Sequence, residues 1–139
     1  MSHDLVLRYF AACTAGDVAA VTACFTDDAV VYDLNHRPVV GADRIGSFYE
    51  KVRDRWAGAA WWVDTYVQQG DHAAIEWAMS GTGPEGPFVV RGSEHYRFAG
   101  GAIAEIRQYW RFDPDHPGGG LVGFPYETDD RFAVAAPDA

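Results

Sequence analysis

The sequence is poor in basic residues and contains no long apolar run. Lys and Arg total 11 against 20 Asp and Glu, which gives a formal net charge of −9. So acidic a domain is poorly suited to phosphate backbones or anionic membrane surfaces, and we expect neither nucleic acid nor a membrane as a partner. No apolar stretch approaches the roughly 20 residues that a membrane-spanning helix needs.

Cysteine is scarce, and the features of a secretion signal are missing. Only Cys13 and Cys24 are present, which is too few for a disulfide framework. The N-terminal residues Met1 to Asp4 lack the basic and apolar regions of a signal peptide. We therefore expect reduced, buried thiols in a cytoplasmic protein.

Patterns typical of cofactor sites are also lacking. The five histidines show no metal-ligand spacing. No glycine-rich phosphate loop follows a predicted strand and opens a helix. We therefore predict no metal, no nucleotide and no flavin.

Aromatic residues, in contrast, are abundant. The 139 residues suit one domain with a substantial core, and they include eight Phe, seven Tyr and five Trp. This aromatic content is typical of a deep apolar cavity, with an ordinary aromatic core as the alternative.

Hydrophobic periodicity divides the chain into helices followed by strands. Apolar residues at helical spacing predict helices over residues 3–15, 18–25 and 44–57. Asp17 and Asp43 are the expected N-caps of the second and third helices. Strands are expected over residues 29–33, 39–41, 61–69, 73–82, 88–98 and 102–112. This order predicts an α+β fold with helices on one face of a curved sheet.

The domain is expected to end where the last strand ends. We predict one domain over residues 1–113 and a loop-rich tail over residues 114–139. The tail holds enough apolar residues to dock on the body, and a lid over the pocket is one role open to it.

The strand from Ala29 to Asp33 carries the main functional signal. It follows an expected turn at Thr26-Asp27-Asp28 and ends in a carboxylate. Alternation places Ala29, Val31 and Asp33 on one face, so Asp33 lies at the edge of an apolar environment. In such a place a carboxylate can become a working base. The alternative is that Asp33 only closes a turn.

Several stretches of the chain match the pattern of one known protein family, and they occur in the same order as in that family. They are Arg8-Tyr9-Phe10, Gly16-Asp17, Phe25 to Ala29 and Asp33, followed by residues 41–49, 96–98, 101–103 and 109–110. On these residues the chain resembles the ketosteroid isomerase branch of the NTF2-like (SnoaL-like) superfamily, from about Tyr9 to Trp110. The resemblance implies a cone-shaped α+β fold, in which three N-terminal helices pack on a curved, mostly antiparallel sheet.

The resemblance also implies roles for three residues. Asp33 matches the family's proton-shuttling carboxylate, and Tyr9 matches the tyrosine that donates a hydrogen bond to the substrate oxygen. Glu94 stands where the family has an aspartic acid that stays protonated and donates to the same oxygen. The glutamate is longer by one methylene, which puts steroid specificity in question. A surface pair with Arg97 or Arg107 is the alternative for Glu94.

A further set of residues is expected to line the pocket. Trp110 and Tyr49 match aromatic positions of the family, and Gln108 shares a strand face with Trp110. The remaining substrate-binding candidates are the aromatic residues Phe48, Trp56 and Trp77.

Two histidines are considered separately from this set. The resemblance extends to dehydratases that pair an aspartate with pocket histidines, and His95 is therefore a catalytic candidate. Strand alternation nevertheless places His95 on the face opposite Glu94. His36 is expected either at the mouth of the pocket or in a solvated loop.

Together these features predict a cofactor-independent general acid/base enzyme that acts on a hydrophobic carbonyl compound. Asp33 would be the base, and Tyr9 with Glu94 the oxyanion donors. The expected reaction is a ketosteroid isomerase-like double-bond isomerisation, or a related polyketide cyclisation or dehydration.

Two alternatives remain. Epoxide hydrolysis or ring opening is disfavoured because neutral Gln108 stands where such enzymes have an acid. A non-catalytic binding or assembly module predicts solvated acids and a pocket filled by aromatic rings. We also expect a homodimer, because sheets of this fold often pair face to face.

Overall fold

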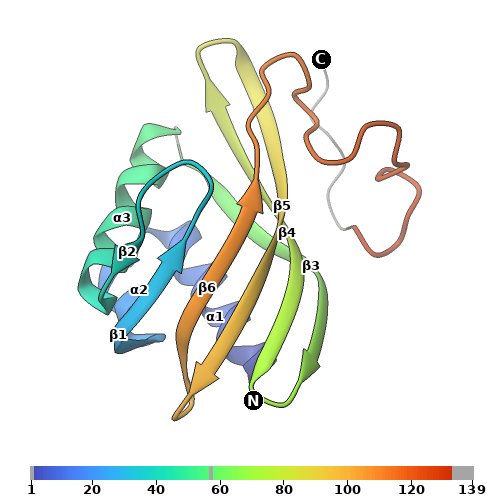
Figure 1. Cartoon of the computed structure of the whole chain (residues 1–139). Coiled ribbons are helices and arrows are strands. Elements are labelled where there is room, and N and C mark those ends of the chain that lie inside the picture. The colour runs from blue at the N-terminus through green and yellow to red at the C-terminus, as the bar shows by residue number, and fades with distance from the viewer. Residues whose placement is uncertain (1, 57, 133–139) are drawn as a thin grey trace.

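Three helices and six strands make up the domain, which Figure 1 shows in a computed structural model that describes residues 2–56 and 58–132. The helices are α1 (Ser2–Ala15), α2 (Val18–Ala23) and α3 (Ala42–Arg55). The strands are β1 (Phe25–Tyr32), β2 (Val39–Val40), β3 (Ala60–Gln69), β4 (His72–Gly83), β5 (Gly86–Ala99) and β6 (Ala102–Trp110).

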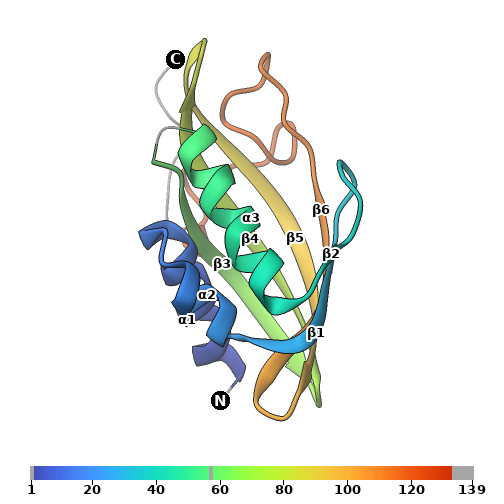
Figure 2. The ribbon, with the colours of Figure 1, turned by 90° about the vertical axis from the view of Figure 1, so that its left-hand side faces the viewer.

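The strands form one curved sheet with the order β2-β1-β6-β5-β4-β3. Strands β1 and β6 are parallel, and every other neighbouring pair is antiparallel. All three helices lie on one face of this sheet, as the side view in Figure 2 shows. The predicted α+β fold with a mostly antiparallel sheet is therefore confirmed.

The helices are held to the sheet by the apolar stripes that the sequence contains. In α1 the buried face includes Leu5, Val6, Tyr9 and Phe10, which recur at helical spacing. Asp17 caps α2 as expected, because its carboxylate accepts a hydrogen bond from the amide of Ala20 at 3.0 Å. These stripes place Tyr9 between α1 and the sheet, where the cavity described below lies.

Two local predictions about the first strand are wrong. The second helix ends at Ala23 instead of Phe25, and Cys24 forms its C-cap. Phe25 already pairs with Ile103 of β6, so the expected turn at Thr26-Asp27-Asp28 belongs to the strand. The register of β1 against β6 shifts between Phe25 and Val30, and this irregularity lets two exposed acids sit in a strand.

The predicted cap of the third helix is also wrong. Gly41 is the N-cap of α3, with a φ of 97° that favours glycine, and Asp43 lies in the first helical turn. In that turn the negative charge of Asp43 still interacts favourably with the positive end of the helix dipole. The predicted end of this helix at Ala57 lies outside the described residues.

The described part of the tail lies on the outer face of the sheet, opposite the helices (Figures 1 and 2). The amide of Val89 in β5 donates to the carbonyl of Pro117 at 2.7 Å. The guanidinium of Arg91 lies 4.1 Å from the centre of the Tyr126 ring. Pro117 and Tyr126 of the tail thus contact the body on the far side of the sheet from the helices.

Gly92 of β5 lies between β4 and β6 at a position that has no room for a side chain. A methyl group there would lie 2.7 Å from the carbonyl oxygen of Tyr109 and 2.8 Å from Cβ of Trp110. Gly92→Ala is therefore expected to lower the free energy of unfolding by about 1–3 kcal/mol through overpacking. Urea denaturation measures this loss, and Ser93→Ala on the opposite face is the matched control. An equal loss in both variants would contradict the packing argument.

Candidate active site

A cavity of about 450 Å³ lies between the helices and the inner face of the sheet. This volume lies within the range of about 300–1,000 Å³ that is usual for small-molecule sites. Nine of the ten predicted site residues line the cavity, namely Tyr9, Asp33, Phe48, Tyr49, Trp56, Trp77, Glu94, Gln108 and Trp110. The cavity is open, so its aromatic side chains form walls and do not fill it.

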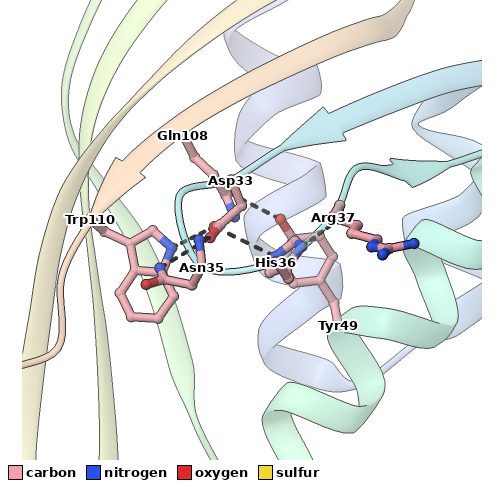
Figure 3. A network of polar contacts seen from close by, with 7 residues as sticks. All are labelled: Asp33, Asn35, His36, Arg37, Tyr49, Gln108 and Trp110. Atoms are coloured by element: carbon pink, nitrogen blue, oxygen red, sulfur yellow. Dashed lines mark hydrogen bonds and ion pairs between the residues drawn. The ribbon is translucent and has the colours of Figure 1, made fainter.

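Asp33 lies directly after β1, and its side chain is fully shielded from solvent. Its Oδ2 accepts hydrogen bonds from Gln108 Nε2 at 2.5 Å and from Trp110 Nε1 at 2.6 Å (Figure 3). Its Oδ1 accepts from the backbone amide of Asn35 at 2.7 Å and from the Asn35 side chain at 3.1 Å. In each of these four hydrogen bonds the carboxyl group of Asp33 is the acceptor.

Glu94 lines the same cavity and is only 3% exposed. Burial raises the pKa of Glu94 from its ordinary value to about 8, and the hydroxyl of Tyr96, which donates to Oε2, lowers it in part. The raised pKa favours the neutral form of Glu94, which can donate a hydrogen bond. This burial excludes the alternative of a surface pair with Arg97 or Arg107.

Tyr9 and Tyr49 are buried next to Glu94, and their rings meet edge to face with centres 5.7 Å apart. Burial raises the pKa of Tyr9 well above its ordinary value, and the neighbouring Tyr49 raises it further. The pKa of Tyr49 is raised by burial and by Glu94. Both hydroxyl groups are thus neutral donors at physiological pH.

Gln108 connects the two polar ends of the cavity. The hydroxyl of Tyr49 donates to Gln108 Oε1 at 3.3 Å, and Gln108 Nε2 donates to Asp33 (Figure 3). The amide therefore has a fixed orientation, because its oxygen faces a donor and its nitrogen faces an acceptor. Gln108 therefore links Tyr49 to Asp33 through two hydrogen bonds.

The predicted aromatic residues form the walls between these ends. The rings of Trp77 and Trp110 lie 6.5 Å apart across the sheet, and Phe48 packs against Tyr49 at 5.3 Å. Trp56 contacts Phe112 near the end of β6, with ring centres 5.6 Å apart. A flat, apolar molecule fits a cavity with walls of this kind.

His95 does not reach the cavity. It lies on the outer face of β5, where its ring packs edge to face against Tyr109 at 5.8 Å. The cause is strand alternation, because Glu94 next to it points inward. The geometry thus gives no support to His95 as a catalytic residue.

Asn35 and His36 complete the surroundings of Asp33, and the sequence alone did not assign roles to them. The bonds from Asn35 to Asp33 form the local turn that an aspartate favours when it bonds to a backbone amide two residues on. The separation of two residues between Asp33 and Asn35 was therefore the sequence signal that could have predicted this contact. His36 lies at 3.6 Å from Asp33 and stacks obliquely on Phe48.

The described residues hold no cluster of His, Cys, Asp or Glu that could bind a metal ion. Within residues 2–56 and 58–132, no helix has both the length and the apolar character needed to cross a membrane. Cys13 and Cys24 are both buried free thiols, and Cys13 lines the cavity.

The chain belongs to the SnoaL-like domain family, whose sequence profile matches residues 6–106. This range includes Tyr9, Asp33 and Glu94. No curated protein matches the sequence.

Solved structures share the fold. A protein of unknown function with a cystatin-like fold from Methylobium petroleophilum PM1 is 26% identical, with a TM-score of 0.72 over 99% of this chain and 93% of its own. A hypothetical protein with a ketosteroid isomerase-like fold from Catenulispora acidiphila DSM 44928, solved in complex with trimethylamine, is 20% identical to this chain. Its TM-score is 0.72 over 82% of this chain and 88% of its own. A candidate SnoaL-like polyketide cyclase from Jannaschia sp. CCS1 is 17% identical, with a TM-score of 0.67 over 77% of this chain and 83% of its own.

Proposed function

We propose that the protein is a cofactor-independent enzyme that moves a proton next to the carbonyl group of a hydrophobic substrate. Asp33 removes the proton from carbon, and Tyr9 and Glu94 donate hydrogen bonds to the oxygen on which negative charge develops. The reaction is a double-bond isomerisation or a related cyclisation or dehydration. The name of the Jannaschia relative, a candidate polyketide cyclase, is consistent with such a substrate.

One observation carries this proposal: one cavity holds a carboxyl group that only accepts hydrogen bonds and a second, buried carboxyl group whose pKa is raised. The side chain of Asp33 accepts four hydrogen bonds, whereas burial raises the pKa of Glu94 to about 8. Two acids in such different environments can supply a base and a neutral hydrogen-bond donor at the same pH.

The same observation argues against a non-catalytic module. Such a module predicts solvated acids and a cavity filled by rings, but both side chains are shielded and the cavity has a volume of about 450 Å³. Epoxide opening lacks support because the position opposite Asp33 holds the neutral amide of Gln108.

Turnover of a 5-ene-3-keto steroid tests the proposal, because the conjugated enone that forms absorbs in the ultraviolet. Tyr9→Phe removes one oxyanion donor and is expected to lower kcat by about 10²–10³-fold. Tyr66→Phe is the matched control, since the Tyr66 hydroxyl bonds only to exposed Gln68 among the contacts described.

Two results would count against this assignment. An equal loss in Tyr9→Phe and Tyr66→Phe would show that the effect is not specific to the cavity. No turnover of any enolisable apolar ketone by the unmodified protein would remove the proposal altogether.

A further inference from the structure

The opening of the cavity carries positive charge, although the protein as a whole is acidic. Arg55 and Arg111 both line the cavity and are exposed, so they lie at its rim. Among the described residues of the lining, the only acids are Asp33 and Glu94, and both are shielded from solvent. Two of the 11 Lys and Arg residues of a chain with a net charge of −9 therefore meet at one opening.

Arg55 has no acidic partner within the described part of the chain, whereas Arg111 lies 2.9 Å from the carboxylate of Asp113. The guanidinium of Arg55 lies 5.1 Å from the centre of the Trp56 ring. That ring is held in turn by Phe112, with ring centres 5.6 Å apart. A guanidinium placed over a ring in this way can still direct its N–H groups at an anion.

The order of contacts along β6 indicates which end of a substrate reaches this rim. Gln108 pairs with Glu94 of β5. Two residues further on, Trp110 donates a hydrogen bond to Asp33, and Arg111 follows directly. A substrate whose carbonyl oxygen meets Glu94 and whose α-carbon meets Asp33 therefore extends past Trp110 toward the rim.

We propose that Arg55 recognises a negatively charged group and that the substrates are apolar carbonyl compounds with a carboxylate at the end remote from the carbonyl group. This inference rests on the proposed function, because Asp33 and Glu94 fix the position of the carbonyl group. A guanidinium forms charge-assisted hydrogen bonds with a carboxylate. The positive rim also attracts an anion that a protein with a net charge of −9 would otherwise repel.

A structural role for Arg55 leads to a different prediction. Arg55 lies in the last turn of α3, where a cation interacts favourably with the negative end of the helix dipole. Loss of that interaction would destabilise the end of the helix and would impair all substrates alike. Recognition of an anion, in contrast, distinguishes two substrates that differ only in charge.

Two steroids that differ in charge at one end test the inference. One is a 5-ene-3-keto steroid with a carboxylic acid on carbon 17, and the other is the methyl ester of that acid. Both share the reacting ring and the absorbance of the enone product. The native protein is expected to show a kcat/KM about fivefold higher for the acid. The gain should appear in KM, because a contact at the rim is the same before and during proton transfer.

The preference should also depend on salt. Raising the ionic strength from about 0.01 M to about 1 M shortens the Debye length from about 30 Å to about 3 Å. The ratio of kcat/KM for the acid to that for the ester should therefore fall in the native protein.

Arg55→Gln is expected to lower this ratio from about fivefold to less than about twofold. Arg55→Lys keeps the positive charge and should retain part of the preference. Arg44→Gln is the matched control, because Arg44 lies on the same helix, is exposed and does not line the cavity. The control has the same change in net charge and should keep the native ratio.

Binding of the reaction product separates this inference from the proposed function. The 4-ene-3-keto acid and its methyl ester bind without turnover, and tryptophan fluorescence can follow them because Trp56, Trp61, Trp77 and Trp110 line the cavity. The native protein should bind the acid about fivefold more tightly than the ester. Arg55→Gln should remove this difference.

The outcomes are distinct. Turnover without a preference for the acid, or a preference that Arg55→Gln leaves intact, overturns the inference and leaves the proposed function standing. Absence of turnover, with tighter binding of the acid that depends on Arg55, overturns the proposed function and supports the anion site. Absence of both turnover and preferential binding overturns both. A preference that is lost in Arg55→Gln and kept in Arg44→Gln supports both.

Discussion

Asp33→Asn is expected to lower kcat for 5-ene-3-keto steroids by about 10²–10⁴-fold, the usual contribution of a general base. An amide in place of the carboxylate has no basic oxygen for the α-proton. Its NH₂ group would also face the donors Gln108 Nε2 and Trp110 Nε1, which now point at Oδ2. The measurement is the initial rate of enone formation at saturating substrate.

A loss of folding must be separated from this loss of chemistry. Asp27→Asn is the matched control, since Asp27 lies on the same strand β1 and is exposed. Thermal unfolding of both variants shows whether the native fold persists. A folded Asp33→Asn protein with unchanged turnover would disprove the assignment of the base.

Glu94→Gln is expected to raise the free energy of unfolding at pH 7 by about 3 kcal/mol. The pKa of Glu94 is raised by burial from 4.5 to about 8, so the folded state keeps a proton that the unfolded state loses. Each unit of difference is about 1.4 kcal/mol, and the difference between pH 4.5 and pH 7 gives the stated value.

The size of this effect changes with pH in a defined window. The contribution of Glu94 to stability is fully present below about pH 4.5, falls as pH rises, and stays low above about pH 8. The native protein and Glu94→Gln should therefore be equally stable near pH 4 and should diverge up to pH 8. Urea denaturation at several pH values measures the difference, and Glu85→Gln on the exposed β4–β5 turn is the control.

The same group sets an expected limit on activity. Ionisation of Glu94 near pH 8 places a negative charge beside the developing enolate, so isomerisation by the native protein should decline above that pH. Glu94→Gln should lack this decline, because the amide does not titrate. A stability difference that does not vary with pH would show that Glu94 is already ionised at neutral pH.

Much of the site was predictable because local periodicity reports which face a residue occupies. Helical spacing placed Tyr9 in the inner stripe of α1, and alternation placed Asp33 with Ala29 and Val31, which are fully buried. Alternation also separated Glu94 from His95 correctly. The roles of these residues came from the family resemblance and remain proposals, as do the homodimer and the cytoplasmic location.

Other features depend on contacts between distant segments. The register shift in β1 arises from its pairing with β6. The local sequence Thr26-Asp27-Asp28 does not predict this pairing. The position of the tail depends on how Pro117 and Tyr126 meet Val89 and Arg91 across the sheet. Local sequence spacing does not predict such tertiary contacts, because the contacting residues lie far apart along the chain.

By itself, the sequence determined the order of helices and strands, the α+β class and the inward faces that carry an acid, a tyrosine and a second acid. These follow from side-chain periodicity, which is a local property. Only the tertiary structure decided that the faces enclose an open cavity, that Gln108 and Trp110 hold Asp33 there, and that His36 stands beside it. The open cavity and the hydrogen bonds to Asp33 depend on the packing of segments up to 77 residues apart, which no local pattern encodes.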